Sequence, residues 1–253
     1  MDRKSIYVAF SNQKGGVGKS AFTTLAASYL HYAGGRNVAV IDCDYPQHSI
    51  FAMRERDKTM VSANEAYKEM MVSQFDAIGK KAYPVLKAKP EEAIGIADKL
   101  VSASPVPVDV VFFDLSGTVN SSGILKSMVS LDYLFCPIIS DRLVMQSSLT
   151  FASTMQEFLK RDTRAPLKGI FLFWNQLIKS ENREVYDAYM SIICNLNLNM
   201  LKTEIPFTVK YKKEMSMNSR NVFRSTLFPP DKTLLKGSNL DLLVDEICQI
   251  INI

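Results

Sequence analysis

The stretch SNQKGGVGKS, residues 11–20, decides how the rest of the chain is interpreted. It follows an apolar run, Ile6–Phe10, and precedes a helical pattern. Its three glycines let successive main-chain N–H groups point at one anion, and the following helix adds the positive end of its dipole. Lys19 can then reach β- and γ-phosphate oxygens, while the Ser20 hydroxyl can coordinate Mg²⁺. The sequence therefore predicts a loop that binds a nucleoside triphosphate.

Composition places the 253 residues among ordinary globular proteins, with 47% hydrophobic and 22% charged residues. No stretch approaches the roughly 18 uninterrupted apolar residues of a membrane span. The first residues run directly into the first predicted strand, which leaves no room for a signal peptide. With two histidines and no CxxC pair, a zinc site or a histidine-based triad is not expected. We predict a cytoplasmic protein with these reduced cysteines: Cys43, Cys136, Cys194 and Cys248.

Apolar runs alternate with helical patterns along the chain, which favours an α/β, doubly wound, mostly parallel sheet with helices on both faces. Ligands of such folds bind at the carboxyl ends of the strands. We predict a single domain over residues 1–253. The predicted strands are Ile6–Phe10, Asn37–Asp42, Val108–Asp114, Tyr133–Pro137, Gly169–Asn175 and Leu201–Ile205. The predicted helices are Ser20–Ala33, Leu143–Leu159, Asn182–Leu196 and Leu240–Ile251.

Residues 45–107 depart from this alternation, because they are long for a crossover and contain no convincing strand. Met53–Met71 and Phe75–Leu86 have helical patterns, and Lys89-Pro90 starts a further helix. We therefore expect a helical excursion within the domain.

Acidic residues end two of the predicted strands and could complete an ATP site. Asp42 and Asp44 follow one strand, and Asp114 ends another in the sequence Asp114-Leu-Ser-Gly117. ATP hydrolysis needs Mg²⁺ and a water molecule aligned with the γ-phosphorus, and carboxylates at this edge can hold both. Asp42, Asp114 and Ser20 are the candidate metal ligands, although Asp42 could equally cap local backbone.

The residues around the loop resemble those of the ParA/MinD family of ATPases. Gln13 stands where the plain phosphate-loop consensus has glycine, and Lys14 adds a second lysine, a pattern known as the deviant Walker A motif. The resemblance covers nearly the whole chain and is closest to ParA-like proteins of plasmids and conjugative transposons. It implies that Asp44 orients the attacking water, that Asp114 holds Mg²⁺ and that Gly117 senses the γ-phosphate.

Three departures from the family pattern leave the hydrolysis rate open. Tyr45 lengthens the loop after Asp44, Ala21 replaces a threonine, and the Asp-Leu-Ser-Gly switch lacks the usual prolines. The resemblance implies slow hydrolysis of ATP to ADP.

Further contacts to the nucleotide follow from the loop and from two later segments. Asn175 ends a strand with an amide that can face a purine, and Thr203-Glu-Ile-Pro206-Phe207 resembles the family segment that lines the base. A strand-end cap is the alternative for Asn175, and Trp174 is expected in the core or an interface. The predicted cofactor contacts are Lys14, Gly15, Gly16, Val17, Gly18, Lys19, Ser20, Ala21, Gly117, Asn175, Pro206 and Phe207.

The resemblance also implies a homodimer in the ATP state. Lys14 stands on the far side of the loop from Lys19 and would reach the γ-phosphate bound by the partner subunit. A cation supplied in trans stabilises charge that develops during phosphoryl transfer. Catalysis would then depend on Lys14, Lys19 and Asp44.

A basic segment, residues 202–224, has six basic residues against two acidic ones, and is either a DNA-binding face or a solvated loop. The candidate contacts to non-specific DNA are Lys210, Lys212, Lys213, Arg220 and Arg224, with Tyr211 and Phe223 interleaved. DNA partitioning or transfer then requires a centromere-binding or mobilisation protein that stimulates hydrolysis, and the ATP state would associate with the nucleoid. The alternatives are an ATP-binding scaffold with little hydrolysis and a MinD-like membrane ATPase. The acidic polar positions of the last helix argue against a membrane partner.

Overall fold

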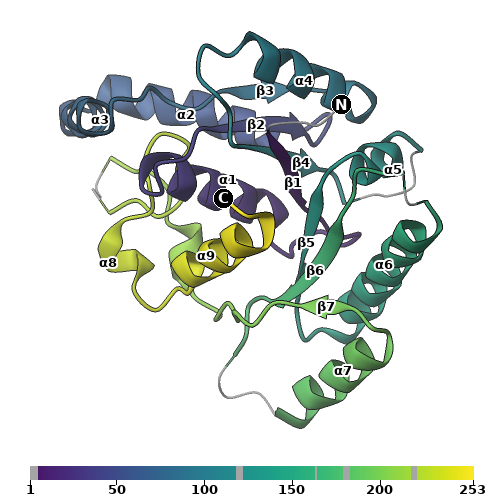
Figure 1. Ribbon diagram of the computed structural model, residues 1–253. Helices are drawn as coiled ribbons and strands as arrows, with labels where there is room; N and C mark the ends of the chain where they lie inside the picture. Colours follow the sequence, from purple (N-terminus) through teal and green to yellow (C-terminus); the bar gives the residue numbers. More distant parts are fainter. Residues whose placement is uncertain (1–4, 118–121, 163, 179–182, 218–220) are drawn as a thin grey trace.

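A parallel β-sheet forms the centre of the computed structural model, which describes residues 5–117, 122–162, 164–178, 183–217 and 221–253 (Figure 1). Within these residues the strand order is β3-β2-β4-β1-β5-β6-β7, and every pair of neighbours is parallel. The predicted fold class is confirmed. The strands are β1 Ile6–Phe10, β2 Val38–Cys43, β3 Val85–Lys87, β4 Val110–Leu115, β5 Tyr133–Ile138, β6 Gly169–Trp174 and β7 Asn199–Met200.

Helices cover both faces of the sheet, because successive strand residues point to opposite faces and both sets are apolar (Figure 1). On β1, Tyr7 and Ala9 pack with α4 to α7, whereas Val8 and Phe10 pack with α1 and α9. The helices are α1 Lys19–Tyr32, α2 Ser49–Ala63, α3 Glu65–Ile78, α4 Ala93–Ala103, α5 Ser122–Val129, α6 Arg142–Arg161, α7 Arg183–Asn195, α8 Lys232–Leu235 and α9 Leu240–Ile251, with short 3-10 helices at Pro90–Glu92 and Val209–Lys212.

The excursion over residues 45–107 differs from its prediction in two places. The helix predicted over Met53–Met71 is divided at Asn64, whose side chain accepts a hydrogen bond from Tyr67 N and caps α3. The helix predicted over Phe75–Leu86 ends at Ile78, where Gly79 adopts a φ of 63°. The chain then returns to the sheet edge as β3, a strand that the sequence pattern did not reveal.

The strand predicted over Leu201–Ile205 is also wrong. The last strand, β7, is Asn199–Met200, and only Leu201 and Ile205 still donate main-chain hydrogen bonds to β6. Between them, the N–H groups of Lys202 and Thr203 donate to the carboxylate of Glu246 on α9, at 2.8 and 2.9 Å. Because these two main-chain N–H groups bond to Glu246, they do not pair with a neighbouring strand, and the predicted strand is not formed.

The C-terminal helix α9 buries an apolar face that includes Leu243, Val244 and Ile247, in the same core layer as α1. That face is therefore occupied by the protein's own core. None of the described helices combines the length and the apolar character needed to cross a bilayer.

Candidate nucleotide-binding site

The glycine-rich loop connects β1 to α1 at the carboxyl edge of the sheet, with β4 and β5 on either side of β1. Gly16 and Gly18 have φ values of 78° and 95°, which L-residues with side chains rarely adopt. A Cβ at Gly18 would also lie 3.0 Å from the ring of Phe22. The loop can therefore bend toward the first turn of α1 only with glycine at these positions.

Two buried asparagines hold this loop. Asn12 Nδ2 donates to Pro137 O and to Ser148 Oγ, each at 2.8 Å, while its Oδ1 accepts from Lys14 N. On the other side of the loop, Asn175 Nδ2 donates to Val17 O at 2.9 Å. The sequence pattern indicated no role for Asn12, and it indicated only a contact to the base or a strand cap for Asn175. Through these hydrogen bonds, both side chains hold the glycine-rich loop in place without a ligand.

Lys19 lies beneath the loop, between its backbone and two carboxylates. Its Nζ donates to Lys14 O at 2.9 Å. Burial lowers the pKa of Lys19, while the nearby Asp114 and Asp44 act in the opposite direction. Gly117 closes the space above it, because a Cβ there would lie 2.9 Å from Lys19 Nζ and 3.2 Å from Gln13 O. Lys19 and Gly117 are thus brought together by strands that are distant in sequence.

Replacement of Gly117 by alanine should weaken MgATP binding by about tenfold, because the new methyl group displaces the ammonium that reaches the phosphates. Calorimetry on the variant measures the loss directly. Gly95→Ala is a matched control, since a Cβ there meets nothing within 4 Å. Equal affinity of Gly117→Ala and wild type would contradict the placement of Lys19.

Asp114, at the end of β4, is buried and neither of its carboxylate oxygens has a hydrogen-bond partner with acceptable geometry among the described residues. Burial raises the pKa of Asp114 to about 7, although the neighbouring Ser20 hydroxyl and Lys19 favour the charged form. A buried carboxylate with so few groups to balance its charge fits a cation that arrives with the ligand. Ser20 and Asp114 would hold Mg²⁺, which would shield the charge of the phosphates.

Asp42 has a different environment from Asp114. One of its oxygens accepts from Asp44 N at 3.2 Å and the other from Phe51 N at 2.9 Å, so both serve local backbone. Within the described residues, no three acidic, histidine or cysteine side chains form a metal cluster. Mg²⁺ bound through one or two protein oxygens and the phosphates needs no such cluster.

Asp44 lies just beyond β2 and is partly buried near Lys19. Burial and the neighbouring Asp42 raise the pKa of Asp44, whereas Lys19 and His48 lower it. The adjacent Tyr45 is 58% exposed, so the additional residue projects toward solvent rather than into the core. Asp44 is therefore near the phosphate loop despite the longer connection.

Binding of MgATP should release a proton from Asp114 at about pH 6 and hardly any at about pH 8.5. Because the pKa of Asp114 is raised to about 7, protons compete with Mg²⁺ below that pH, and affinity should fall as pH falls. Calorimetry in buffers of different ionisation enthalpy counts the protons. Asp114→Asn, the control, should lose this pH-dependent release; equal release by the variant would assign the proton to another group.

A cavity of about 360 Å³ continues from the loop along the first turn of α1. Three of the residues predicted to face the base, Asn175, Pro206 and Phe207, line it together with Gly16, Gly18 and Ala21. Trp174 does not line this cavity, and its ring packs in the core against Tyr186. The cavity is also lined by residues that the sequence pattern did not connect with the nucleotide: Phe22, Gln176, Thr208, Tyr211, Lys212 and Arg224.

The candidate DNA-binding residues do not share one environment. Lys213 is exposed, Lys210 Nζ donates to Lys236 O, and Lys212 and Arg224 line the cavity. Arg220 lies outside the described residues. The interpretation of Tyr211 and Phe223 as interleaved DNA-contacting aromatics is wrong, because their rings pack on each other and Phe223 is fully buried. Tyr211 lines the cavity, whereas Phe223 packs behind it in the core.

Comparison with known folds identifies similar proteins with a low sequence identity. A protein of Borrelia burgdorferi B31 assigned to plasmid partition, bound to AMPPNP, is 16% identical and has a TM-score of 0.59, with 96% of this chain and 98% of that chain covered. The cell division ATPase MinD of Pyrococcus furiosus is 14% identical, with a TM-score of 0.59 and coverages of 98% and 100%.

A variant of Cyanothece McdA in complex with ATP is 13% identical, with a TM-score of 0.57 and coverages of 100% and 98%. A search among curated proteins finds no match to the sequence. The sequence profile of the CobQ/CobB/MinD/ParA nucleotide-binding domain matches residues 8–221, which include the loop, Asp44, Asp114 and most of the cavity. The chain therefore belongs to the CobQ/CobB/MinD/ParA family of nucleotide-binding domains.

Proposed function

We propose that the protein is a ParA-like ATPase that dimerises around MgATP, binds DNA without sequence preference and acts in the partitioning or transfer of plasmid or conjugative-element DNA. Hydrolysis to ADP would reverse dimerisation, stimulated by DNA or by a centromere-binding or mobilisation protein. The observation that carries the proposal is the meeting of Lys19, Gly117 and Asp114 beneath a glycine-rich loop in which Gly16 and Gly18 have positive φ values.

Each part of that arrangement has a defined chemical role. Lys19 neutralises phosphate charge, Ser20 and Asp114 would hold Mg²⁺, and the backbone of Gly117 is close enough to respond to a γ-phosphate near Lys19. Asp44 would orient the attacking water. The AMPPNP and ATP bound to the similar folds from Borrelia and Cyanothece support adenine as the base.

Dimerisation is supported by the surface around the loop. Lys14 is exposed, and apolar side chains are exposed in the connections that follow β2 and β6 and in the first turn of α6, which follows β5. The carboxyl ends of parallel strands share one edge of a sheet, so these segments lie at the same edge as the nucleotide site. Exposed apolar area of this kind favours burial against a second copy. The residues are Tyr45, Leu143 and Ile178, with exposed fractions of 58%, 71% and 39%.

Calorimetry combined with a DNA-binding assay tests the proposal. MgATP should bind with measurable heat, and DNA should bind in MgATP but not in ADP or without nucleotide. DNA affinity should fall steeply with added salt, because bound cations release condensed counterions. Absence of any heat with MgATP and with MgADP would overturn the proposed function; ATP binding with a flat salt response would remove only its DNA part.

One alternative is an ATP-binding scaffold that hydrolyses little. Its basis is the longer connection after Asp44, but the position of Asp44 near Lys19 favours the hydrolysing switch. The MinD-like membrane alternative has less support, because the apolar face of α9 packs in the core.

A further inference from the structure

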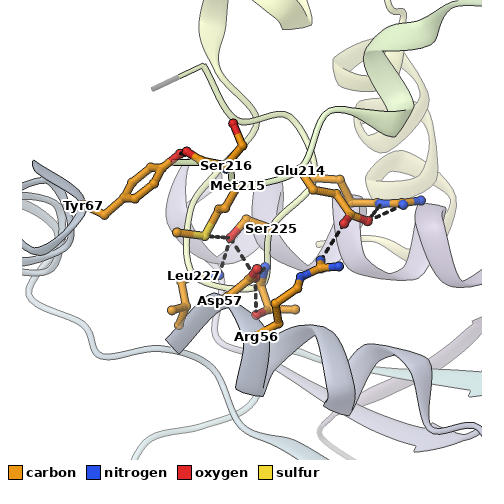
Figure 2. Close-up of polar contacts among 10 residues, drawn as sticks. Arg56, Asp57, Tyr67, Glu214, Met215, Ser216, Ser225 and Leu227 are labelled. Carbon is orange, nitrogen blue, oxygen red and sulfur yellow. Dashed lines mark hydrogen bonds and ion pairs between the residues drawn. The ribbon is translucent and has the colours of Figure 1, made fainter. Parts of the chain in front are cut away.

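One cation in the cavity wall, Arg224, is held in place by a bridge to a distant helix. Its Nε donates to Oε1 of Glu214 at 3.1 Å, and its Nη2 contacts the same oxygen. The other oxygen of Glu214 accepts from Nη2 of Arg56 on α2 at 2.7 Å (Figure 2). Two guanidinium groups thus share one carboxylate, so the cluster keeps a net positive charge.

The segment that carries Arg224 runs along α1. Ser225 O accepts from Ser28 Oγ and Thr226 O accepts from the Tyr32 hydroxyl, at 2.5 and 2.9 Å. Ala21 lies seven residues before Ser28, on the same face of the helix. Arg224, one residue before Ser225, therefore reaches the first turns of α1, which explains why Arg224 and Ala21 line one cavity.

That end of α1 is where the loop and the helix dipole attract a phosphate. Ala21 can offer a main-chain N–H to it but has no hydroxyl. Arg224 has an Nη1 edge that donates to none of the described residues, and its side chain is 24% exposed. A guanidinium with one edge on a carboxylate can use its other edge for a phosphate oxygen.

We propose that Arg224 is a nucleotide-binding residue whose guanidinium donates to a phosphate oxygen at the nucleoside end of the triphosphate, and that Glu214 and Arg56 position it. This inference rests on the proposed function, and it transfers Arg224 from the candidate DNA face to the nucleotide. The phosphate in question is present in ATP and ADP alike.

A second contact fixes the same segment to α2. Asp57 Oδ2 accepts from Ser225 Oγ at 3.0 Å, and from Thr226 N and Oγ1 at 2.7 and 2.9 Å (Figure 2). Asp57 and the two residues it binds are buried. The excursion over residues 45–107, for which the sequence indicated no role, thus braces one wall of the nucleotide cavity through α2.

Calorimetry with MgATP and MgADP on a set of variants tests the contact. Arg224→Ala should weaken both ligands by about ten- to a hundredfold and to the same extent, because it removes a charge-assisted hydrogen bond to a phosphate they share. Arg224→Lys should recover part of the loss. Lys213→Ala is the matched control, an exposed cation of the same segment outside the cavity, and should bind as wild type does.

The positioning role is tested through Glu214→Gln and Arg56→Ala. Each should weaken nucleotide binding by about two- to fivefold, the range of a partly exposed ion pair. Neither should add to the loss in the Arg224→Ala background, whereas a general loss of stability would persist there. Because Arg56 is 48% exposed, Arg56→Ala keeps the test available if Arg224→Ala does not fold.

Two results would overturn the inference and leave the proposed function intact. The first is a wild-type protein that binds MgATP together with an Arg224→Ala variant of unchanged affinity. The second is an Arg224→Ala variant that loses DNA binding but keeps its nucleotide affinity, which would assign Arg224 to DNA binding instead. Failure of the wild type to bind either nucleotide would instead refute the proposed function itself.

Discussion

Replacement of Lys14 by alanine should abolish ATP-dependent dimerisation and leave the affinity of one subunit for MgATP within about twofold, the usual range for an exposed substitution. The structure gives the physical reason, because the groups of Lys14 that act within its own subunit belong to the main chain. Its carbonyl accepts from Lys19 Nζ and its N–H donates to Asn12 Oδ1, and alanine keeps both. Only the exposed ammonium is lost.

Sedimentation velocity in AMPPNP, in ADP and without nucleotide measures this effect. Gln13→Ala is the matched control, since Gln13 is the adjacent exposed residue of the same loop and carries no charge. The control should dimerise with AMPPNP as wild type does. An unaltered dimer of Lys14→Ala would show that the second lysine does not act across the interface.

Replacement of Asp44 by alanine should lower the rate of phosphate release by about a hundredfold while MgATP still binds, the usual effect of removing a general base or water-orienting carboxylate. Asp44 is near Lys19, where the γ-phosphate is expected, and its raised pKa makes it a better proton acceptor than an exposed aspartate. Binding persists because the loop, Lys19 and Asp114 are unchanged.

Phosphate release in the presence and absence of DNA distinguishes the switch from the scaffold. Tyr45→Ala serves as the control, because it keeps the length of the connection and removes only an exposed ring. Wild-type turnover no faster than that of Asp44→Ala, with DNA present, would support the scaffold alternative and would remove hydrolysis from the proposed function.

The sequence by itself determined the strands next to the nucleotide site and the loop that connects β1 to α1. Ile6–Phe10 and the glycines that follow act through local geometry: a continuous run of apolar side chains that become buried, glycines that can adopt positive φ values, and a lysine at the first residue of a helix. Strand-end acids could be found for the same reason, because parallel strands bring their carboxyl ends to one edge. Such features depend on neighbours within a few residues.

Only the tertiary structure decided the ends of the sheet and the wall of the cavity. β3 is an edge strand of three residues, which is too short to show a periodic pattern in the sequence. The strand predicted at Leu201–Ile205 is interrupted by Glu246, which lies 43 residues after Thr203 in the chain. In the sequence, Arg224 belongs to a basic segment whose composition is typical of DNA binding. In the structure, its contact with Glu214, which also binds Arg56, and the packing of its segment on α1 place Arg224 in the cavity wall. A charge takes its role from the groups that surround it in space, and those groups lie too far along the chain for any local pattern to specify.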